Sequence, residues 1–436
     1  MFPKYKTIPM LIVVLAIAAS MPPLCVRAAE VITLEQALEI AIKHNPTLAA
    51  SHSEVNAARA RLTQTKATYY PQLNASAGVN RTWTELGNDS SSTNSDGRVD
   101  NYSTGLSITQ YLFDFGKTPA QVKESSQSLS SIEKNVESVE RTLARNVKQA
   151  YFEVLKQQQL VIVGKENLEV RRQQLEQARA LYRQGLRPKI DVTRGKVEVS
   201  QAQLSLVIVE YGLQEAIIAF EKLLGGQPVS GSYSLAEEIS SSTATPALED
   251  LIQIALDKRP ELAGLEAQTK AAESGLLSAQ KTAYPSLSAS GTYTYDGESL
   301  PMEDQQWKAG IYLNWPLFTG FRQTGQVNEA KSDVNRLNAQ LDSLKLSVRQ
   351  EVTQAYFQLR TAQETIRNAE IALNQAKDNL AIAQGRYEAG VSDSIELSDA
   401  QVLYTESRST LVQAVYERHK ALAELEFAAG IQFLNG

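Results

Sequence analysis

The chain has almost no cysteine and very little histidine. Cys25 is the single cysteine among 436 residues, so we expect neither disulfides nor thiol chemistry. The three histidines lie too far apart for a zinc-ligand pattern, and we expect no metal and no cofactor. Nucleophile-elbow, P-loop and dinucleotide-binding motifs are missing as well. These absences predict a protein that is not an enzyme and has no catalytic residues.

Positive charge is not in excess either. Lys and Arg together number 43 against 49 Asp and Glu, a formal charge of −6. A chain that binds nucleic acid usually carries a basic surface, so we expect no nucleic-acid partner. The apolar content of 43% is too high for a disordered chain and is enough for a large folded one.

A long apolar run is found only at the N-terminus. Lys4 and Lys6 precede the apolar segment Ile8 to Ala19, and Val26-Arg27-Ala28 offers the small residues that a signal peptidase reads. The segment is shorter than the roughly 20 residues of a spanning helix. Residues 1–28 are therefore predicted to be a signal peptide that is cleaved after export. No later segment looks long and apolar enough to be a transmembrane helix.

The rest of the sequence is an internal duplication. Leu34-Glu35 and Tyr70-Pro71 recur 214 residues later, and the segment QAYF at 149–152 recurs at 354–357. Two consistent offsets over so many positions indicate a tandem repeat, which decides the fold. We predict a first repeat at 32–225, a Gly/Ser/Thr-rich linker at 226–245 and a second repeat at 246–430.

Both repeats predict the same order of elements. Short helices come first, and Asn45-Pro46 breaks one helix and starts the next. Long stretches that are nearly free of proline then predict helices of roughly 100 Å, at about 1.5 Å per residue. The expected ranges are a β-hairpin at about 71–113, a long helix at about 117–184 and a last helix at about 190–225, and in the second repeat about 285–317, 322–389 and 394–429.

The strands alternate between apolar side chains and small polar ones. Leu73, Ala75 and Ala77 alternate with Asn74 and Ser76, and the other three strands follow the same rule. A half-buried soluble sheet shows the same alternation, but the uniformly small polar face and the export signal favour a membrane barrel. Aromatic residues could form girdles at its interfaces: Trp83, Tyr102, Tyr293, Tyr295, Trp307 and Trp315.

Four strands cannot close a membrane barrel alone. Membrane barrels have at least about 8 strands, and an open edge in lipid would leave backbone groups unpaired. The protein must therefore oligomerise if its strands are in a membrane: a dimer would supply eight strands and a trimer twelve. Residues 85–101 and 296–306 would form the external loops.

The second long helix has a regular heptad pattern. Its twelve a and d positions, from Val348 to Tyr387, are all apolar or aromatic, and nine of the twelve matching positions in the first copy are too. The exceptions are Gln157, Gly164 and Arg171. Spacing of this kind predicts coiled-coil packing, which by itself would also suit a soluble coiled coil.

The order of these motifs resembles that of the TolC-like outer-membrane efflux proteins. The residues that carry the resemblance are LFDFGK (112–117), LFTGFR (317–322), the two QAYF segments and the turns YRQGLRPKIDV (182–192) and YEAGVSDSIEL (387–397). The family implies an α+β membrane protein: a homotrimeric 12-stranded barrel in outer-membrane lipid, continued by an α-helical barrel in the periplasm. It also implies a periplasmic adaptor and an inner-membrane pump as partners.

The resemblance assigns roles to residues at the far ends of the long helices. Gly185, Leu186, Gly390 and Val391 would contact the adaptor, although glycines there also suit an ordinary helix end. Glu396, Asp399, Tyr387 and Asp191 would form the periplasmic gate, with Glu396 and Asp399 as rings of carboxylates that favour cations. Carboxylates at a helix N-terminus are equally explained by the helix dipole.

We therefore expect a passive exit duct for small molecules or polypeptides, located in the outer membrane and reaching into the periplasm. The alternative is an exported coiled-coil protein without a channel, such as an adhesin or a structural subunit. That alternative would not need four alternating strands at matched repeat positions.

Overall fold

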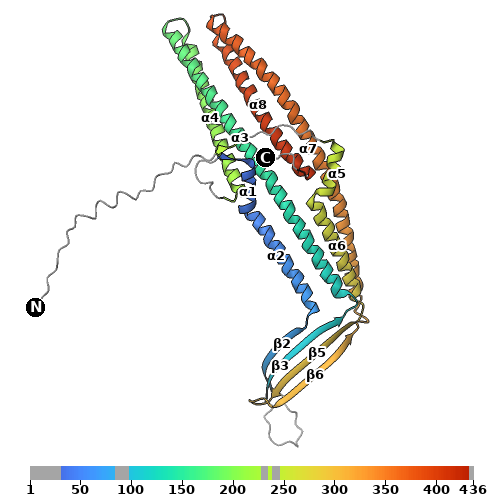
Figure 1. The fold of residues 1–436 in the computed structure, drawn as a ribbon. Coiled ribbons are helices and arrows are strands. Elements are labelled where there is room, and N and C mark those ends of the chain that lie inside the picture. The colour runs from blue at the N-terminus through green and yellow to red at the C-terminus, as the bar shows by residue number, and fades with distance from the viewer. Residues whose placement is uncertain (1–30, 84–97, 227–233, 238–245, 432–436) are drawn as a thin grey trace, which may run out of the picture.

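The computed structural model describes residues 31–83, 98–226, 234–237 and 246–431. The predicted signal peptide, most of the loop at 85–101 and part of the linker at 226–245 lie outside these residues. Within them the chain is elongated, with a β-sheet at one end and long helices running away from it (Figure 1).

Both repeats contain two short helices, a β-hairpin and two long helices. Local chemistry sets several of the helix starts: the Thr33 hydroxyl and the Gln36 side chain form a capping box, and the Asn45 side chain accepts from the Thr47 amide at 2.9 Å. The helices are α1 Leu34–His44, α2 Pro46–Lys66, α3 Lys117–Arg183 and α4 Lys189–Leu223, then α5 Leu248–Lys258, α6 Pro260–Lys281, α7 Arg322–Glu388 and α8 Ser394–Ala429; a 3-10 turn, η1 Ala67–Tyr69, follows α2.

The long helices α3 and α7 have 67 residues each, which makes them about 100 Å long. In the half far from the sheet, α3 packs against α4 and α8, and α7 packs against α8. In the half near the sheet, α6 lies between α3 and α7, and α2 lies beside α3. The heptad positions of α7 form its packed face, with Val348 and Val352 fully buried. The predicted coiled-coil packing is confirmed.

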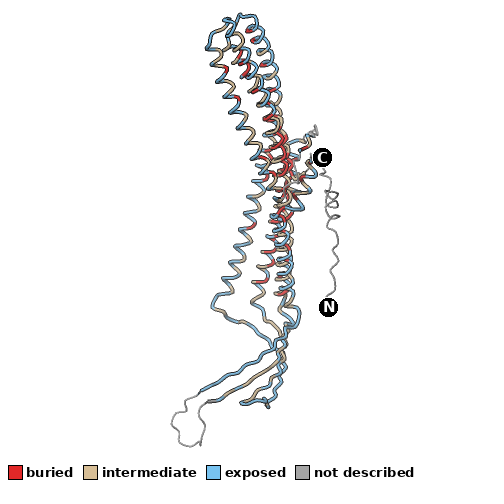
Figure 2. The backbone as a smooth tube through the Cα atoms, turned by 90° about the vertical axis from the view of Figure 1, so that its left-hand side faces the viewer, coloured by how far each residue is buried: buried red, intermediate tan, exposed pale blue. Residues whose placement is uncertain are grey.

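Most buried residues lie midway along the helices, where helices of both repeats meet (Figure 2). We call this region the equatorial core. Its first cluster joins α1, α2, α3 and α4 through residues such as Leu48, Val147 and Phe220, and its second joins α5, α7 and α8 through Leu251 and Leu425. Close-packed apolar burial of this extent is the main stabilising term of the chain.

The linker contributes a strand to this core, which the sequence analysis did not anticipate. Strand β4 (Ser234–Leu235) pairs in parallel with β1 (Val31–Ile32), and the Tyr151 hydroxyl lies 2.7 Å from the carbonyl oxygen of Ala236. The first residues of the described chain and the linker are thereby fixed to α3.

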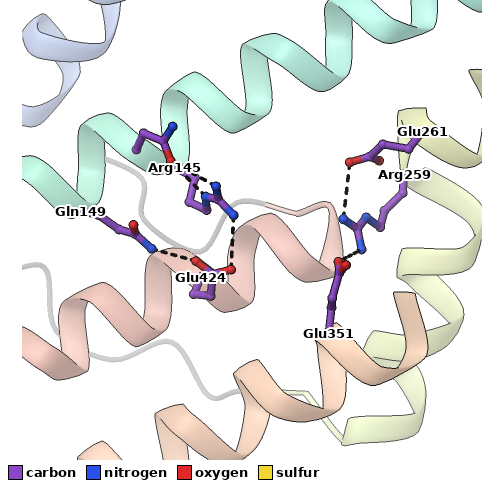
Figure 3. A network of polar contacts seen from close by, with 7 residues as sticks. Arg145, Gln149, Arg259, Glu261, Glu351 and Glu424 are labelled. Carbon is purple, nitrogen blue, oxygen red and sulfur yellow. Dashed lines mark hydrogen bonds and ion pairs between the residues drawn. The ribbon is translucent and has the colours of Figure 1, made fainter. Parts of the chain in front are cut away.

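A polar network holds α8 to its neighbours at the same level (Figure 3). Glu424 on α8 accepts from Gln149 on α3 at 2.7 Å, and Arg259 before α6 pairs with Glu351 on α7 at 2.5 Å. The guanidinium groups of Arg145 and Arg259 both lie over the ring of Phe427. Helices from both repeats are therefore joined by charge as well as by apolar contact.

The sheet has four antiparallel strands in the order β2-β3-β5-β6. They are β2 Gln72–Trp83, β3 Arg98–Phe113, β5 Ser286–Gly297 and β6 Asp304–Asn314. The predicted count of four strands is confirmed, but residues 98–101, expected in the external loop, belong to β3. Strands β2 and β6 each have one edge without a partner strand in the described chain.

One helix is more apolar over its full length than any continuous run in the sequence indicates. Helix α4 is long and apolar enough to cross a membrane by length and composition, with only 17% of its most apolar window buried. The apolar run is interrupted by Glu210 and Glu215, which is why no continuous segment stands out in the sequence. An apolar helix that is exposed in the single chain requires another covering.

Candidate membrane face and gate

The two faces of the sheet differ in polarity. Register places Ala75, Leu106, Tyr293 and Trp307 in one row across the four strands. The neighbouring row, on the opposite face, is Asn74, Ser107, Thr292 and Lys308. Every residue of β2 is exposed, so the described part of the chain covers neither face of this strand. A sheet of this kind suits lipid on one side and water on the other.

A register shift corrects one detail of the predicted alternation. Strict alternation along β3 would place Leu112 in the same row as Leu106, but the pairing of β3 with β5 shifts between Tyr111 and Phe113. The shift places Phe113 opposite Leu287, so Phe113 takes the apolar position. A bulge of one residue reverses the faces beyond it, and alternation alone does not reveal it.

The predicted girdle residues fall in two groups. Trp83, Tyr102, Tyr293, Tyr295 and Trp307 lie in the half of the sheet far from the helices, whereas Trp315 follows β6 at the helix end. Most aromatic residues at that end were not predicted, because all but Phe113 lie in the connections outside the strands. These exposed side chains are Tyr69, Tyr70, Phe113, Phe115, Tyr284, Phe318 and Phe321.

Arg81, which interrupts the apolar row, has its counter-ion directly opposite. Its guanidinium forms two hydrogen bonds with Asp100, at 2.5 and 2.7 Å. The pair lies near the outer end of β2 and β3, where charged side chains reach the interface. The charge in the apolar row is therefore paired.

The second candidate region is the tip, which we define as the turns at 184–188 and 389–393. Gly185 and Gly390 both have φ of +73°, and the next amides, of Leu186 and Val391, each bond at 3.0 Å to a carbonyl five residues earlier. This is a Schellman ending, which glycine permits. Leu186 and Val391 are 67% and 69% exposed, so the tip presents two apolar side chains to solvent.

Arg187 joins the two turns of the tip. Its guanidinium donates to the carbonyl oxygen of Ser392 at 3.0 Å and lies 4.9 Å from the ring centroid of Tyr387. Tyr387 is 6% exposed, and burial raises its hydroxyl pKa, an effect that Arg187 opposes. Arg187 and Ser392 occupy matching positions of the two repeats, which was the only sequence signal for this contact.

The predicted gate residues are brought together only in part. Asp191 accepts from the Ser394 hydroxyl at 3.0 Å and lines a small cavity with Tyr387. Glu396 instead pairs with Arg386 at 2.9 Å, across the turn between α7 and α8. Asp399 is exposed on the same face of α8, one turn from Glu396, and has no ion pair in the described part of the chain.

In the sequence, Arg171 stands out only as an exception to the heptad pattern. In the structure it is 5% exposed and joins three helices: Glu198 on α4 at 3.2 Å, and the Ser398 hydroxyl on α8 at 3.3 Å. Burial lowers the pKa of its guanidinium, and Glu198 opposes that shift. The matching position in the second repeat is Ala376, so the interruption of the pattern marks a polar contact between hairpins.

Among the described residues, no group of His, Cys, Asp or Glu side chains is arranged to hold a metal ion. What the described residues offer is an amphipathic sheet and, on long helices, a tip with both polar and apolar side chains.

Comparisons with known proteins agree on one family. The family model described as "Outer membrane efflux protein" matches residues 37–226 and 251–431, which is once per repeat. The chain is 26% identical to Protein CyaE of Bordetella pertussis over 95% of this chain and 87% of that protein. It is 24% identical to outer membrane protein TolC of Vibrio cholerae, over 89% and 88%. The CmeC outer membrane channel of Campylobacter jejuni has the same fold, with a TM-score of 0.81 at 16% identity, covering 91% of this chain and 85% of that one.

Proposed function

The chain belongs to the outer membrane efflux protein family, and on that basis we propose that three copies of it form one gated duct. Members of the family are outer-membrane channels of tripartite efflux and type I secretion systems and not enzymes, and this chain is such a channel. The proposal adds the trimer, the gate residues, the docking surface and the processing of the N-terminus.

The observation that carries the proposal is the open amphipathic sheet. Within the described residues nothing covers its apolar face at β2, and β2 and β6 each have one edge without a partner strand. In lipid each unpaired backbone group costs several kcal/mol, so β6 of one copy must pair with β2 of the next. Three copies give the twelve strands that the family resemblance implies.

The helices support ring closure through the internal repeat. Helix α3 packs against α4 and α8, and its counterpart α7 packs against α8 but not extensively against α4. Phe152 on α3 is buried against His419, whereas the matching Phe357 on α7 is 58% exposed. We place α4 of the next copy against α7. Exposed apolar residues on α4 recur every seven residues, as such a contact requires: Ile190, Val197, Leu204, Tyr211 and Ile218.

The tip is our candidate for the gate and for the docking surface. In a trimer, Glu396 and Asp399 would each form a ring of three carboxylates, which attracts cations. Tyr387 contacts Arg187, and Asp191 accepts from Ser394, so each residue is joined to the other repeat. These two contacts would hold the closed arrangement. Leu186 and Val391 follow Gly185 and Gly390 in the two turns and are the apolar residues that a periplasmic adaptor would cover. An inner-membrane pump would bind to that adaptor.

Export requires a leader, and we propose that residues 1–28 are that leader and are removed. The support is the charge and the apolar run of the segment, since it lies outside the described residues. N-terminal sequencing of the protein extracted from membranes tests this: the first residue should be Ala29.

Ion selectivity tests the gate. In a planar bilayer, Glu396→Ala with Asp399→Ala should lower the cation preference of the channel, because both rings lose their charge. A matched control replaces two exposed carboxylates near the sheet end of α7, Glu329→Ala with Asp342→Ala. Unchanged selectivity in the first variant would remove Glu396 and Asp399 from the gate.

A further inference from the structure

A basic cavity lies where the second repeat passes from sheet to helices. Its volume is about 230 Å³, and it is lined by the end of α6, the start of β5, the end of β6 and the first turns of α3 and α7. Three cationic side chains line it, each from a different helix: Lys117, Lys281 and Arg322.

These cations have no carboxylate of their own. Asp114 is the one acidic residue among those that line the cavity, and both of its oxygens are used by the first turn of α3. One accepts from the Thr118 amide at 2.7 Å and the other from the Gly116 amide at 3.2 Å. Lys117, Lys281 and Arg322 form no ion pair in the described part of the chain. The cavity therefore has an excess of positive charge.

The same cations stand at unfavourable positions on their helices. Lys117 and Arg322 are the first residues of α3 and α7, at the end where the helix dipole is positive and anions are preferred. The two repeats differ at this point. In the first, Asp114 accepts from the start of α3, whereas in the second Thr319 stands at the matching position and α7 has no side-chain cap. A bound anion would compensate both the side-chain charge and the dipole.

The cavity is at the depth where a membrane surface is expected. Ser286 and Asn314, which line it, are the helix-side ends of β5 and β6. Tyr284 also lines it and stacks on the ring of Phe115, with 5.6 Å between the ring centroids. The Lys281 ammonium lies 4.7 Å from the ring centroid of Tyr284. Cations beside aromatic rings at an interface are the setting in which proteins hold lipid headgroups.

We propose that this cavity binds a phosphate group, and that the phosphate is the headgroup of a phospholipid in the periplasmic leaflet. The proposal rests on the outer-membrane location of the sheet. Arg322 supplies a planar donor that can bond two phosphate oxygens, and Lys117 and Lys281 supply point charges from either side. A bound headgroup would fix the level of the membrane at the junction between barrel and helices.

The test measures phospholipid binding by native mass spectrometry of the full chain in detergent. The probe is palmitoyl-oleoyl-phosphatidylglycerol in mixed micelles, titrated with and without inorganic phosphate. The variant is Lys117→Gln with Lys281→Gln and Arg322→Gln, which should bind the lipid at least about tenfold more weakly. The control changes three exposed cations of α7, Lys331→Gln, Lys345→Gln and Arg349→Gln, and should stay within about twofold.

The titrations with and without inorganic phosphate distinguish a lipid headgroup from a free anion as the ligand. Lipid binding that survives millimolar phosphate identifies the headgroup as the ligand, and lipid displaced by phosphate identifies a site for free anions. Equal lipid affinity in the triple variant and the native chain overturns the proposal. If the triple variant does not assemble, Arg322→Gln alone should weaken binding and Arg322→Lys should restore part of it. Bilayer conductance of the variants checks the channel separately, so the lipid site can fail while the channel function stands.

Discussion

The sheet and the equatorial core are built by the same chain under opposite conditions. Phe220 and Val147 in the core are 0% exposed, whereas every residue of β2 is exposed. The core is stabilised by water exclusion within one chain. The described part of the sheet has no such core, and we propose that lipid on one face and neighbouring copies at its edges stabilise it. On this account, the buried equatorial core can fold within one chain, whereas the exposed apolar surface of the sheet is where lipid and other copies are expected to bind.

The largest effect is expected in the core. Phe220→Ala should lower the free energy of unfolding by about 3–5 kcal/mol, because it leaves a cavity beside Tyr151. Denaturant unfolding of the detergent-solubilised chain measures this. The matched control is Ile218→Ala, two residues along α4 and 65% exposed. It should leave the fold intact and weaken the trimer, and equal losses of folding stability in both variants would contradict the distinction.

The next largest effect is expected when a charge is placed on the apolar face of the sheet and not on the polar face. Leu106→Arg places a charge in the apolar row and should cost about 2–4 kcal/mol of stability in the membrane. Ser107→Arg, one residue along the same strand, faces the polar side and should assemble normally while changing conductance. The readout is the fraction of each variant recovered as assembled protein from outer membranes. Poor assembly of Ser107→Arg with normal assembly of Leu106→Arg would mean that the faces are reversed.

Acid should weaken the core specifically. His419 is 2% exposed, its Nδ1 has no hydrogen-bond partner in the described part of the chain, and burial, with help from Arg418, lowers its pKa to about 4. The unfolded chain then binds a proton that the folded chain does not, so stability falls as the pH drops from about 6.5 to about 4. The full loss is roughly 3 kcal/mol.

His419→Phe keeps a ring against Phe152 and removes this titration. Melting temperatures at pH 7 and pH 4.5 should differ less in the variant than in the native chain. Glu153 adds acid sensitivity of the same sign, but mainly below pH 4.5. Burial raises its pKa, and hydrogen bonds from Lys156 and Lys420 outweigh that effect and lower it from 4.5 to about 2. Equal acid sensitivity in both proteins would show that His419 is not responsible.

The smallest effect is expected at the tip, which has neither lipid nor a large core. Arg187→Ala removes the bond to Ser392 and the contact with Tyr387, worth about 1.5 kcal/mol, or roughly a tenfold rise in the ratio of open to closed channels. Single-channel recording measures that ratio. Arg183→Ala, an exposed cation four residues earlier, is the control and should leave it unchanged.

Sequence alone could predict the parts of the fold that depend on periodicity. Alternation from Leu73 onward located the sheet and its faces, and the heptads of α7 located its packed side. It could not predict the shift at Leu112, because one inserted residue leaves no sign in composition. It also missed β4, which is too short to show a pattern and forms only because β1 and Tyr151 lie beside it.

The candidate site was less predictable than the fold. The positions of Gly185 and Gly390 follow from the end of each long helix, so the repeat reveals them. The contacts of Arg187 and Arg171 depend on how one hairpin packs on the other, and each cation bonds to residues more than 200 positions away. A charged residue that interrupts a heptad in one repeat, with alanine in the other, is the signal that could have revealed Arg171.

Planar-bilayer recording of the purified full chain tests the central claim most directly. The native protein should insert from detergent and give discrete, cation-selective steps, and Arg187→Ala should give them more often. The absence of steps from both proteins, together with solubility without detergent, would contradict the account of an outer-membrane duct that is gated at its tip.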